Sequence, residues 1–269
     1  MHGAIVGDII GSVHEGRGTK TKKFPLFTPE SRFTDDSVLT IAVADALLTG
    51  KSYTDALQEY ARGYPHAGYG GMFIRWALQS RREPYQSFGN GSAMRVSPVA
   101  YRFDTIEEVL KQAEASAAVT HDHPEGIKGA QAVALAMFLA RTGCEKPEIR
   151  ARIRDRFQYA LDQPLDEIRP NYTFEVSCQQ TVPQAIQAFL ESADFEDSIR
   201  NAISLGGDAD TMACIAGAIA EAYYGGVPDD IAHVALSRLE PPLLDVAQRF
   251  HDRWVAPCLA NAPKRPSDQ

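Results

Sequence analysis

The chain has 269 residues, of which 44% are hydrophobic and 23% charged, and its formal net charge at pH 7 is −8. This composition suits a globular protein with a large core, and the negative charge disfavours nucleic acids and anionic membranes as partners. A nucleotide ligand stays compatible with it, because a small polyanion needs only a local positive potential or a metal ion.

Cysteine usage and the first residues predict the compartment. The four cysteines are scattered and form no CxxC pair, which predicts neither a disulfide framework nor a zinc site. The opening MHGAIVGDII lacks the basic region and cleavage site of a signal peptide. No run of about 18 apolar residues occurs. We therefore expect a cytoplasmic protein without a membrane span.

Most segments repeat their apolar residues at helical spacing. In chain order, helices are predicted at about 3–16, 35–50, 52–63, 70–80, 104–120, 124–143, 147–161, 182–192, 195–204, 208–224, 228–238 and 241–254. Residues 172–181 alternate like a strand, but one isolated segment makes no sheet. We expect an all-α fold, with one compact many-helix domain over residues 1–258 and a disordered tail over residues 259–269.

Two acidic clusters stand where a loop enters an apolar helix: Thr34, Asp35 and Asp36 in RFTDDSVLTI, and Asp208, Asp210 and Thr211 in SLGGDADTMACIAG. Both offer oxygen ligands without His or Cys, which suits Mg²⁺, Mn²⁺ or Ca²⁺ better than zinc. Four converging aspartates would need cations or protons to offset their repulsion. Alternatively the clusters cap two separate helices that never meet, and the spacing alone favours this capping.

The segment SFGNGSAMR predicts an anion site. Gly89 and Gly91 flank Asn90 before a predicted helix, where backbone N–H groups can approach a phosphate, and Arg95 adds a cation. Taken alone, the segment is more simply a turn with an Asn–Gly helix entry.

Four further polar residues lie at helix ends or within an apolar helix. In VTHDHPEG, His123 is expected to cap a helix or lie in water, while the role of His121 stays open. A carboxylate in an apolar helix is costly unless it is bonded, so Asp8 is expected to accept structural hydrogen bonds. Glu15 lies on roughly the same face, at the end of the first predicted helix.

Taken together, these motifs resemble the ADP-ribosylglycohydrolase family, the DraG-like ADP-ribosylhydrolases. Four stretches between residues 3 and 225 carry the resemblance: GAIVGDIIGSVHEG, FTDDSVLTIAVADALL, FGNGSAMRVSPVAY and AISLGGDADTMACIAGAIAEAYYG. The order FTDDS then SLGGDADT is specific, whereas either motif alone is weak.

The resemblance implies an orthogonal helical bundle of that family, with two Mg²⁺ or Mn²⁺ ions in a cleft. The implied metal ligands are Thr34, Asp35, Asp36, Asp208, Asp210 and Thr211, which replaces capping as the interpretation of both clusters. The residues implied for catalysis are Glu15, Asp35 and Asp210. The residues implied for substrate binding are Asn90, Gly91, Ser92 and Met94 for the diphosphate and ribose, His121 near the ligand, and Phe88 stacked on adenine.

The implied activity is hydrolysis of the bond between ADP-ribose and an acceptor by metal-positioned water, in a monomer. The favoured substrate is an ADP-ribosylated protein with an arginine linkage. Serine linkages, O-acetyl-ADP-ribose and modified nucleic-acid ends stay open, as does the choice between Mg²⁺ and Mn²⁺. A second hypothesis is an inactive, ADP-ribose-binding or crystallin-like member, although the complete ligand set argues against it. A third is a different metal hydrolase or lyase, but neither motif has the DDxxD spacing of prenyl-transfer enzymes.

Overall fold

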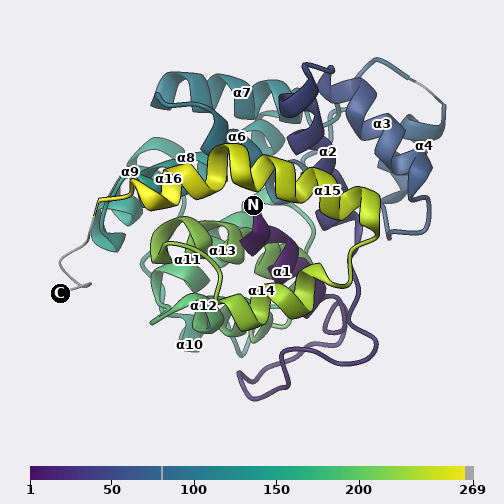
Figure 1. Cartoon of the computed structure of the whole chain (residues 1–269). Coiled ribbons are helices and arrows are strands. Elements are labelled where there is room, and N and C mark those ends of the chain that lie inside the picture. The colour runs from purple at the N-terminus through teal and green to yellow at the C-terminus, as the bar shows by residue number, and fades with distance from the viewer. Residues whose placement is uncertain (80, 264–269) are drawn as a thin grey trace.

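The computed structural model describes residues 1–79 and 81–263, and it is built from helices (Figure 1). No strand occurs within these residues, so the all-α prediction is confirmed. The helices are α1 (His2–Gly11), α2 (Asp35–Thr49), α3 (Tyr53–Gly63), α4 (Gly71–Leu78), α5 (Gly91–Met94), α6 (Ser97–Arg102), α7 (Ile106–Ala118), α8 (Pro124–Arg141), α9 (Lys146–Phe157), α10 (Leu165–Ile168), α11 (Cys178–Leu190), α12 (Phe195–Ile203), α13 (Ala209–Tyr224), α14 (Asp229–Leu236), α15 (Pro241–Phe250), the π-helical turn η1 (His251–Val255) and α16 (Ala256–Ala260).

Several predicted elements have bounds that differ from the expectation. Helix α1 stops at Gly11 because the chain then turns, with the His14 amide donating to the Gly11 carbonyl at 2.7 Å. The extended segment forms only one bridge, between Gly89 and Ser177, before α11 begins. The last predicted helix continues through η1 into α16 and so crosses the expected domain boundary at residue 258. Residues 264–269 of the predicted tail lie outside the described residues.

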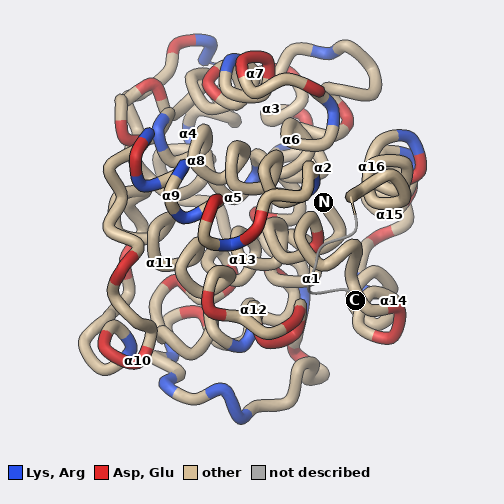
Figure 2. Tube along the Cα trace, turned by 90° about the vertical axis from the view of Figure 1, so that its left-hand side faces the viewer, with Lys and Arg blue, Asp and Glu red and all other residues tan. Residues whose placement is uncertain are grey.

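The centre of the molecule is the contact between α1 and α13 (Figure 1). Every residue of α1 is buried, as is nearly all of α13. Glycines allow the two backbones to approach closely, since a Cβ on Gly7 would lie 2.0 Å from the Ala213 carbonyl oxygen. Charged residues gather on the outer helices and loops, whereas the central helices carry few (Figure 2). Within the described residues, no helix is long and apolar enough to cross a membrane.

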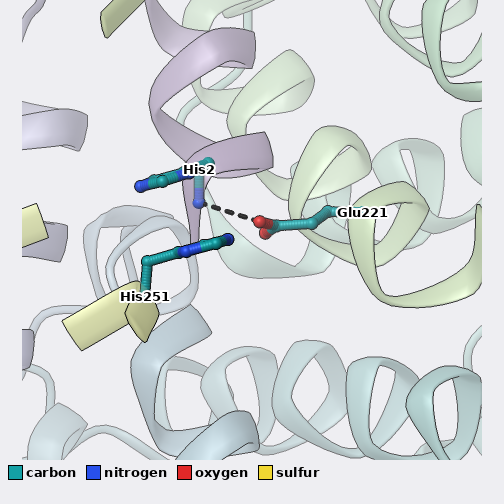
Figure 3. A group of neighbouring side chains, drawn as sticks. All are labelled: His2, Glu221 and His251. Carbon is teal, nitrogen blue, oxygen red and sulfur yellow. Dashed lines mark hydrogen bonds between the residues drawn. The ribbon is translucent and has the colours of Figure 1, made fainter. Parts of the chain in front are cut away.

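His2 of α1, Glu221 of α13 and His251 of η1 form a cluster in which His2 and Glu221 are buried and His251 is half-buried (Figure 3). The His2 amide donates to Glu221 Oε1 at 3.1 Å, and the Met1 amino group pairs with Oε2. The two imidazole rings stack with 4.2 Å between centroids and 2° between planes. In-plane lone pairs of parallel rings do not converge on one ion, and Glu221 is already engaged. The cluster therefore fits a role in fastening η1 to α1 and α13.

Candidate functional site

A cleft of about 520 Å³ opens at the N-termini of α2 and α13. One wall consists of residues 68–75, which enter and form α4, and the other of residues 85–91 with Phe174 and Val176. The two segments of the second wall are joined by backbone hydrogen bonds, including that from the Asn90 amide to the Val176 carbonyl at 2.7 Å. Both predicted acidic clusters contribute to the lining between these walls.

The first cluster is built by the start of α2. Thr34 is its N-cap, and its hydroxyl accepts a hydrogen bond from the Asp36 amide at 3.4 Å. The N-cap that the capping interpretation predicts is therefore present. The Asp36 side chain, in the first turn, is buried and only 2% exposed. Asp35 is held by its amide, which donates to the Ala67 carbonyl at 2.8 Å, and it lines the cleft.

The second cluster stands at the start of α13, with Asp208 as N-cap and Asp210 in the first turn. The Asn90 side-chain amide donates to Asp208 Oδ2 at 2.7 Å, which ties the cluster to the glycine-rich segment. The Thr211 hydroxyl donates to Asp36 Oδ2 at 3.4 Å. The structure therefore brings together two clusters that lie far apart in the sequence.

Asp8 joins these acids, which sequence reasoning missed. It accepts hydrogen bonds from the Thr34 amide at 2.9 Å, the Thr34 hydroxyl at 2.6 Å, and both the amide and the hydroxyl of Ser37. The expected structural hydrogen bonds are thus present. In addition, carboxylate oxygens of Asp8, Asp36 and Asp210 all lie within 4.8 Å of one another, as do those of Glu15, Asp208 and Asp210.

This concentration of negative charge shifts the protonation equilibria. Burial, together with neighbouring carboxylates, raises the pKa of Asp35 to about 8 and raises the pKa of Asp36 and of Asp210 well above the usual range. Among the described residues, no Lys or Arg forms an ion pair with these groups. Asp36 Oδ1 is buried without a hydrogen-bond partner. The arrangement is short of positive charge and of donors.

The predicted substrate-binding residues are placed unequally. Asn90, Gly91, Met94 and His121 line the cleft. Ser92 does not: its fully buried hydroxyl donates to the Gly126 carbonyl at 2.7 Å, toward α8.

The aromatic and acidic candidates differ in their relation to the cleft. Phe88 is not among the residues that line it; its side chain is 51% exposed and lies edge-on to His123 with 5.5 Å between ring centroids. Glu15 is exposed and contributes to the lining, and burial and then Asp208 raise its pKa. His123 caps α8 by accepting from the Glu125 amide at 3.1 Å, as expected.

Sequence reasoning also missed the wall formed by residues 68–75. Gly68 adopts a φ of +106°, and a Cβ on Gly70 or Gly71 would contact nothing, so the backbone is open to the cleft at the N-terminus of α4. The run GYGG directly before an apolar helix is a signal that marks such a loop. Arg75 follows one turn later on the same wall.

Comparison with known proteins agrees with this fold. A sequence model described as ADP-ribosylglycohydrolase matches residues 1–260. The ADP-ribosylhydrolase ARH3 of Mus musculus is 27% identical, over 84% of this chain and 82% of its own length. The ADP-ribosylarginine hydrolase Tri1 of Pseudomonas putida is 26% identical, over 93% and 76%. A solved structure titled "ADP-ribosylglycohydrolase-related protein complex" has the same fold, with a TM-score of 0.67 at 23% identity over 93% of this chain and 96% of that one. The chain belongs to the ADP-ribosylglycohydrolase family.

Proposed function

We propose that this chain is a metal-dependent hydrolase of the glycosidic bond between ADP-ribose and a protein acceptor. The observation that carries the proposal is the meeting of both acidic clusters in one cleft beside the glycine-rich segment. Family membership supports hydrolase chemistry on ADP-ribose conjugates in general. A crystallin-like structural role would not require this convergence of buried acids.

The donor set fits hard divalent cations. Carboxylates and threonine hydroxyls are the ligands that Mg²⁺ and Mn²⁺ prefer, and the unpartnered Asp36 Oδ1 is suited to a cation. Two ions would be held by Thr34, Asp35, Asp36, Asp208, Asp210 and Thr211. Such ions supply Lewis acidity, which orients a diol and makes water more acidic.

The chain itself supplies positioning and proton transfer. The Thr34 hydroxyl donates to Asp8 Oδ1 at 2.6 Å, so its oxygen rather than its hydrogen is available to a cation. Asn90 holds Asp208 through its side-chain amide, while its neighbour Gly91 keeps the backbone open for a phosphate. Glu15, at the mouth, would carry a proton to or from water or the leaving group, and its raised pKa brings it nearer to neutral pH.

The proposed substrate is a mono-ADP-ribosylated protein, and a linkage to arginine is the first to test. The linkage depends on loops around the mouth rather than on the acidic centre.

The test is the release of free ADP-ribose from arginine- and serine-linked substrates, read by mass spectrometry with Mg²⁺ or with EDTA. We expect Mg²⁺-dependent release from one linkage and at least about 100-fold slower release by Asp210→Asn, since the variant loses a charged metal ligand. Asp166→Asn is the matched control, because that carboxylate is 89% exposed and far along the chain from both clusters. Equal rates with EDTA, or equal rates for Asp210→Asn and wild type, would refute the metal-dependent mechanism.

A further inference from the structure

His121 stands at the back of the cleft with one nitrogen free. Its side chain is 5% exposed, and it lines the cleft. The Nε2 atom faces the glycine-rich segment, since a Cβ on Gly91 would lie 3.2 Å from it and a Cβ on Gly89 would lie 3.6 Å from it. Within the described part of the chain, Nε2 has no hydrogen-bond partner, whereas Nδ1 is 2.7 Å from the Thr120 hydroxyl.

The proton arrangement behind His121 is set by Arg95. A guanidinium can only donate hydrogen bonds, and Arg95 Nη2 donates to the Thr120 hydroxyl at 2.8 Å and to the Ser116 carbonyl at 3.0 Å. The Thr120 oxygen is thus already an acceptor. Its own hydrogen is available for Nδ1, and a hydroxyl polarised by a cation becomes a better donor. Nδ1 then accepts, and the ring hydrogen of neutral His121 resides on Nε2.

Arg95 favours the Nε2–H tautomer of His121 over the Nδ1–H tautomer, because the Arg95 charge is buried without a counter-ion. The side chain is fully buried, forms no ion pair in the described structure, and leaves Nε and Nη1 without partners. Burial and then the Arg95 charge hold the pKa of His121 well below its usual range, so the ring is neutral at pH 7. A proton on Nδ1 would point toward the oxygen that Arg95 already occupies.

Tyr85 is the competing partner. Its ring centroid is 6.1 Å from that of His121, and its hydroxyl also approaches Thr120. If Thr120 gave its hydrogen to Tyr85, Nδ1 would have to donate to an oxygen next to an uncompensated guanidinium. That arrangement is electrostatically unfavourable, so the hydrogen of Thr120 goes to His121.

We propose that Arg95 and Thr120 are positioning residues that hold His121 as the neutral Nε2–H tautomer, which offers a hydrogen-bond donor to a phosphoryl or ribose oxygen in the cleft. The tautomer follows from the chain alone, while the identity of the ligand rests on the proposed function. His121 is thereby assigned to ligand binding as a donor, and not to metal binding or to general base catalysis.

The tautomer is tested by ¹⁵N-resolved imidazole spectra at pH 7, with the His121 signals assigned from a His121→Gln spectrum. We expect the Nε2–H pattern in the wild type, its loss or mixing with the other tautomer in Thr120→Val, and its return in Thr120→Ser. The Val and Ser variants are a matched pair, because Thr120 is fully buried and only Ser restores the hydroxyl. An Nδ1–H tautomer or a protonated ring in the wild type would overturn the inference.

Calorimetric titration with ADP-ribose and Mg²⁺ tests the donor role. One neutral hydrogen bond is worth about three- to tenfold in affinity, so Thr120→Val should bind ADP-ribose about three- to tenfold more weakly than Thr120→Ser. Equal affinities despite a changed tautomer would overturn the donor role. Absence of ADP-ribose binding to the wild-type chain would instead refute the proposed function, and the nitrogen spectra would still decide the tautomer.

Discussion

Removing divalent metal should make the stability of this chain fall steeply as pH rises. Carboxylate oxygens of Asp8, Asp36 and Asp210 lie within 4.8 Å of one another. At that distance two unit charges repel by about 3.5 kcal/mol at an effective dielectric of about 20. Three such pairs amount to about 10 kcal/mol, which is comparable with the whole stability of a typical domain. The metal-free chain therefore has to keep protons on this cluster.

The direction in which stability changes with pH follows from the raised pKa values. The pKa of Asp35 is about 8 in the folded chain, against 3.8 for an unperturbed carboxyl, and the pKa values of Asp36 and Asp210 are raised as well. The folded chain binds these protons more tightly than the unfolded chain. The stability they contribute is complete below about pH 4 and is lost as pH rises through the folded-state pKa. Across that window each group lowers the free energy of unfolding by about 1.4 kcal/mol per pH unit.

The assay is thermal unfolding at several pH values between 5 and 8, with EDTA and with Mg²⁺. In EDTA the Tm should fall by at least about 3 °C per pH unit, because 1 kcal/mol corresponds to about 2–4 °C for a chain of this size. Mg²⁺ displaces the protons, so the Tm gained from it should grow from pH 5 to pH 8. A gain that is constant with pH, or a flat Tm in EDTA, would refute the reasoning. Asp36→Asn should reduce the slope, while Asp166→Asn should leave it unchanged.

Three substitutions and one control substitution test the backbone and the support of the site. Gly7→Ala should lower the free energy of unfolding by at least about 3 kcal/mol in urea titration, since the new Cβ would meet the Ala213 backbone at 2.0 Å; Gly63→Ala, where nothing is near, should be neutral or slightly stabilising. Gly91→Ala should weaken ADP-ribose binding in calorimetry with little change in Tm, because its Cβ points at His121 Nε2. Asp8→Asn should lower the stability by about 2 kcal/mol in Mg²⁺, since one amide oxygen cannot replace a carboxylate that accepts four hydrogen bonds.

Local sequence patterns are sufficient to predict the helices that carry the site residues. Thr34 before an apolar run predicts the start of α2, and an apolar run closed by Gly225 predicts the extent of α13. The cap at His123 is likewise a local property. The hydrogen bond between Thr211 and Asp36 spans 175 residues, and no local pattern predicts it. Only the order of the two motifs, through the family resemblance, indicated that they meet.

Other features depend on tertiary contacts that carry no local signal. The Ser92 hydroxyl points toward the Gly126 carbonyl on a neighbouring helix and therefore away from the cleft. The glycine-rich motif alone does not predict this direction. Residues 68–75 become a wall because the Asp35 amide bonds to the Ala67 carbonyl. In the sequence, Asp8 is a single carboxylate within an apolar helix. Only the fold brings it next to Thr34 and Asp36.

The charge balance of the cleft argues that cations bind before or together with the substrate. Four aspartates, at positions 35, 36, 208 and 210, bring about four negative charges when ionised, and the diphosphate of ADP-ribose adds about two. The N-termini of α2 and α13 together offset only about one charge. Arg75 lines the cleft and offsets one more. About four negative charges stay uncompensated, which two divalent cations neutralise. Without them the acids that organise the site either keep their protons or, when ionised, repel the substrate that the site is proposed to bind.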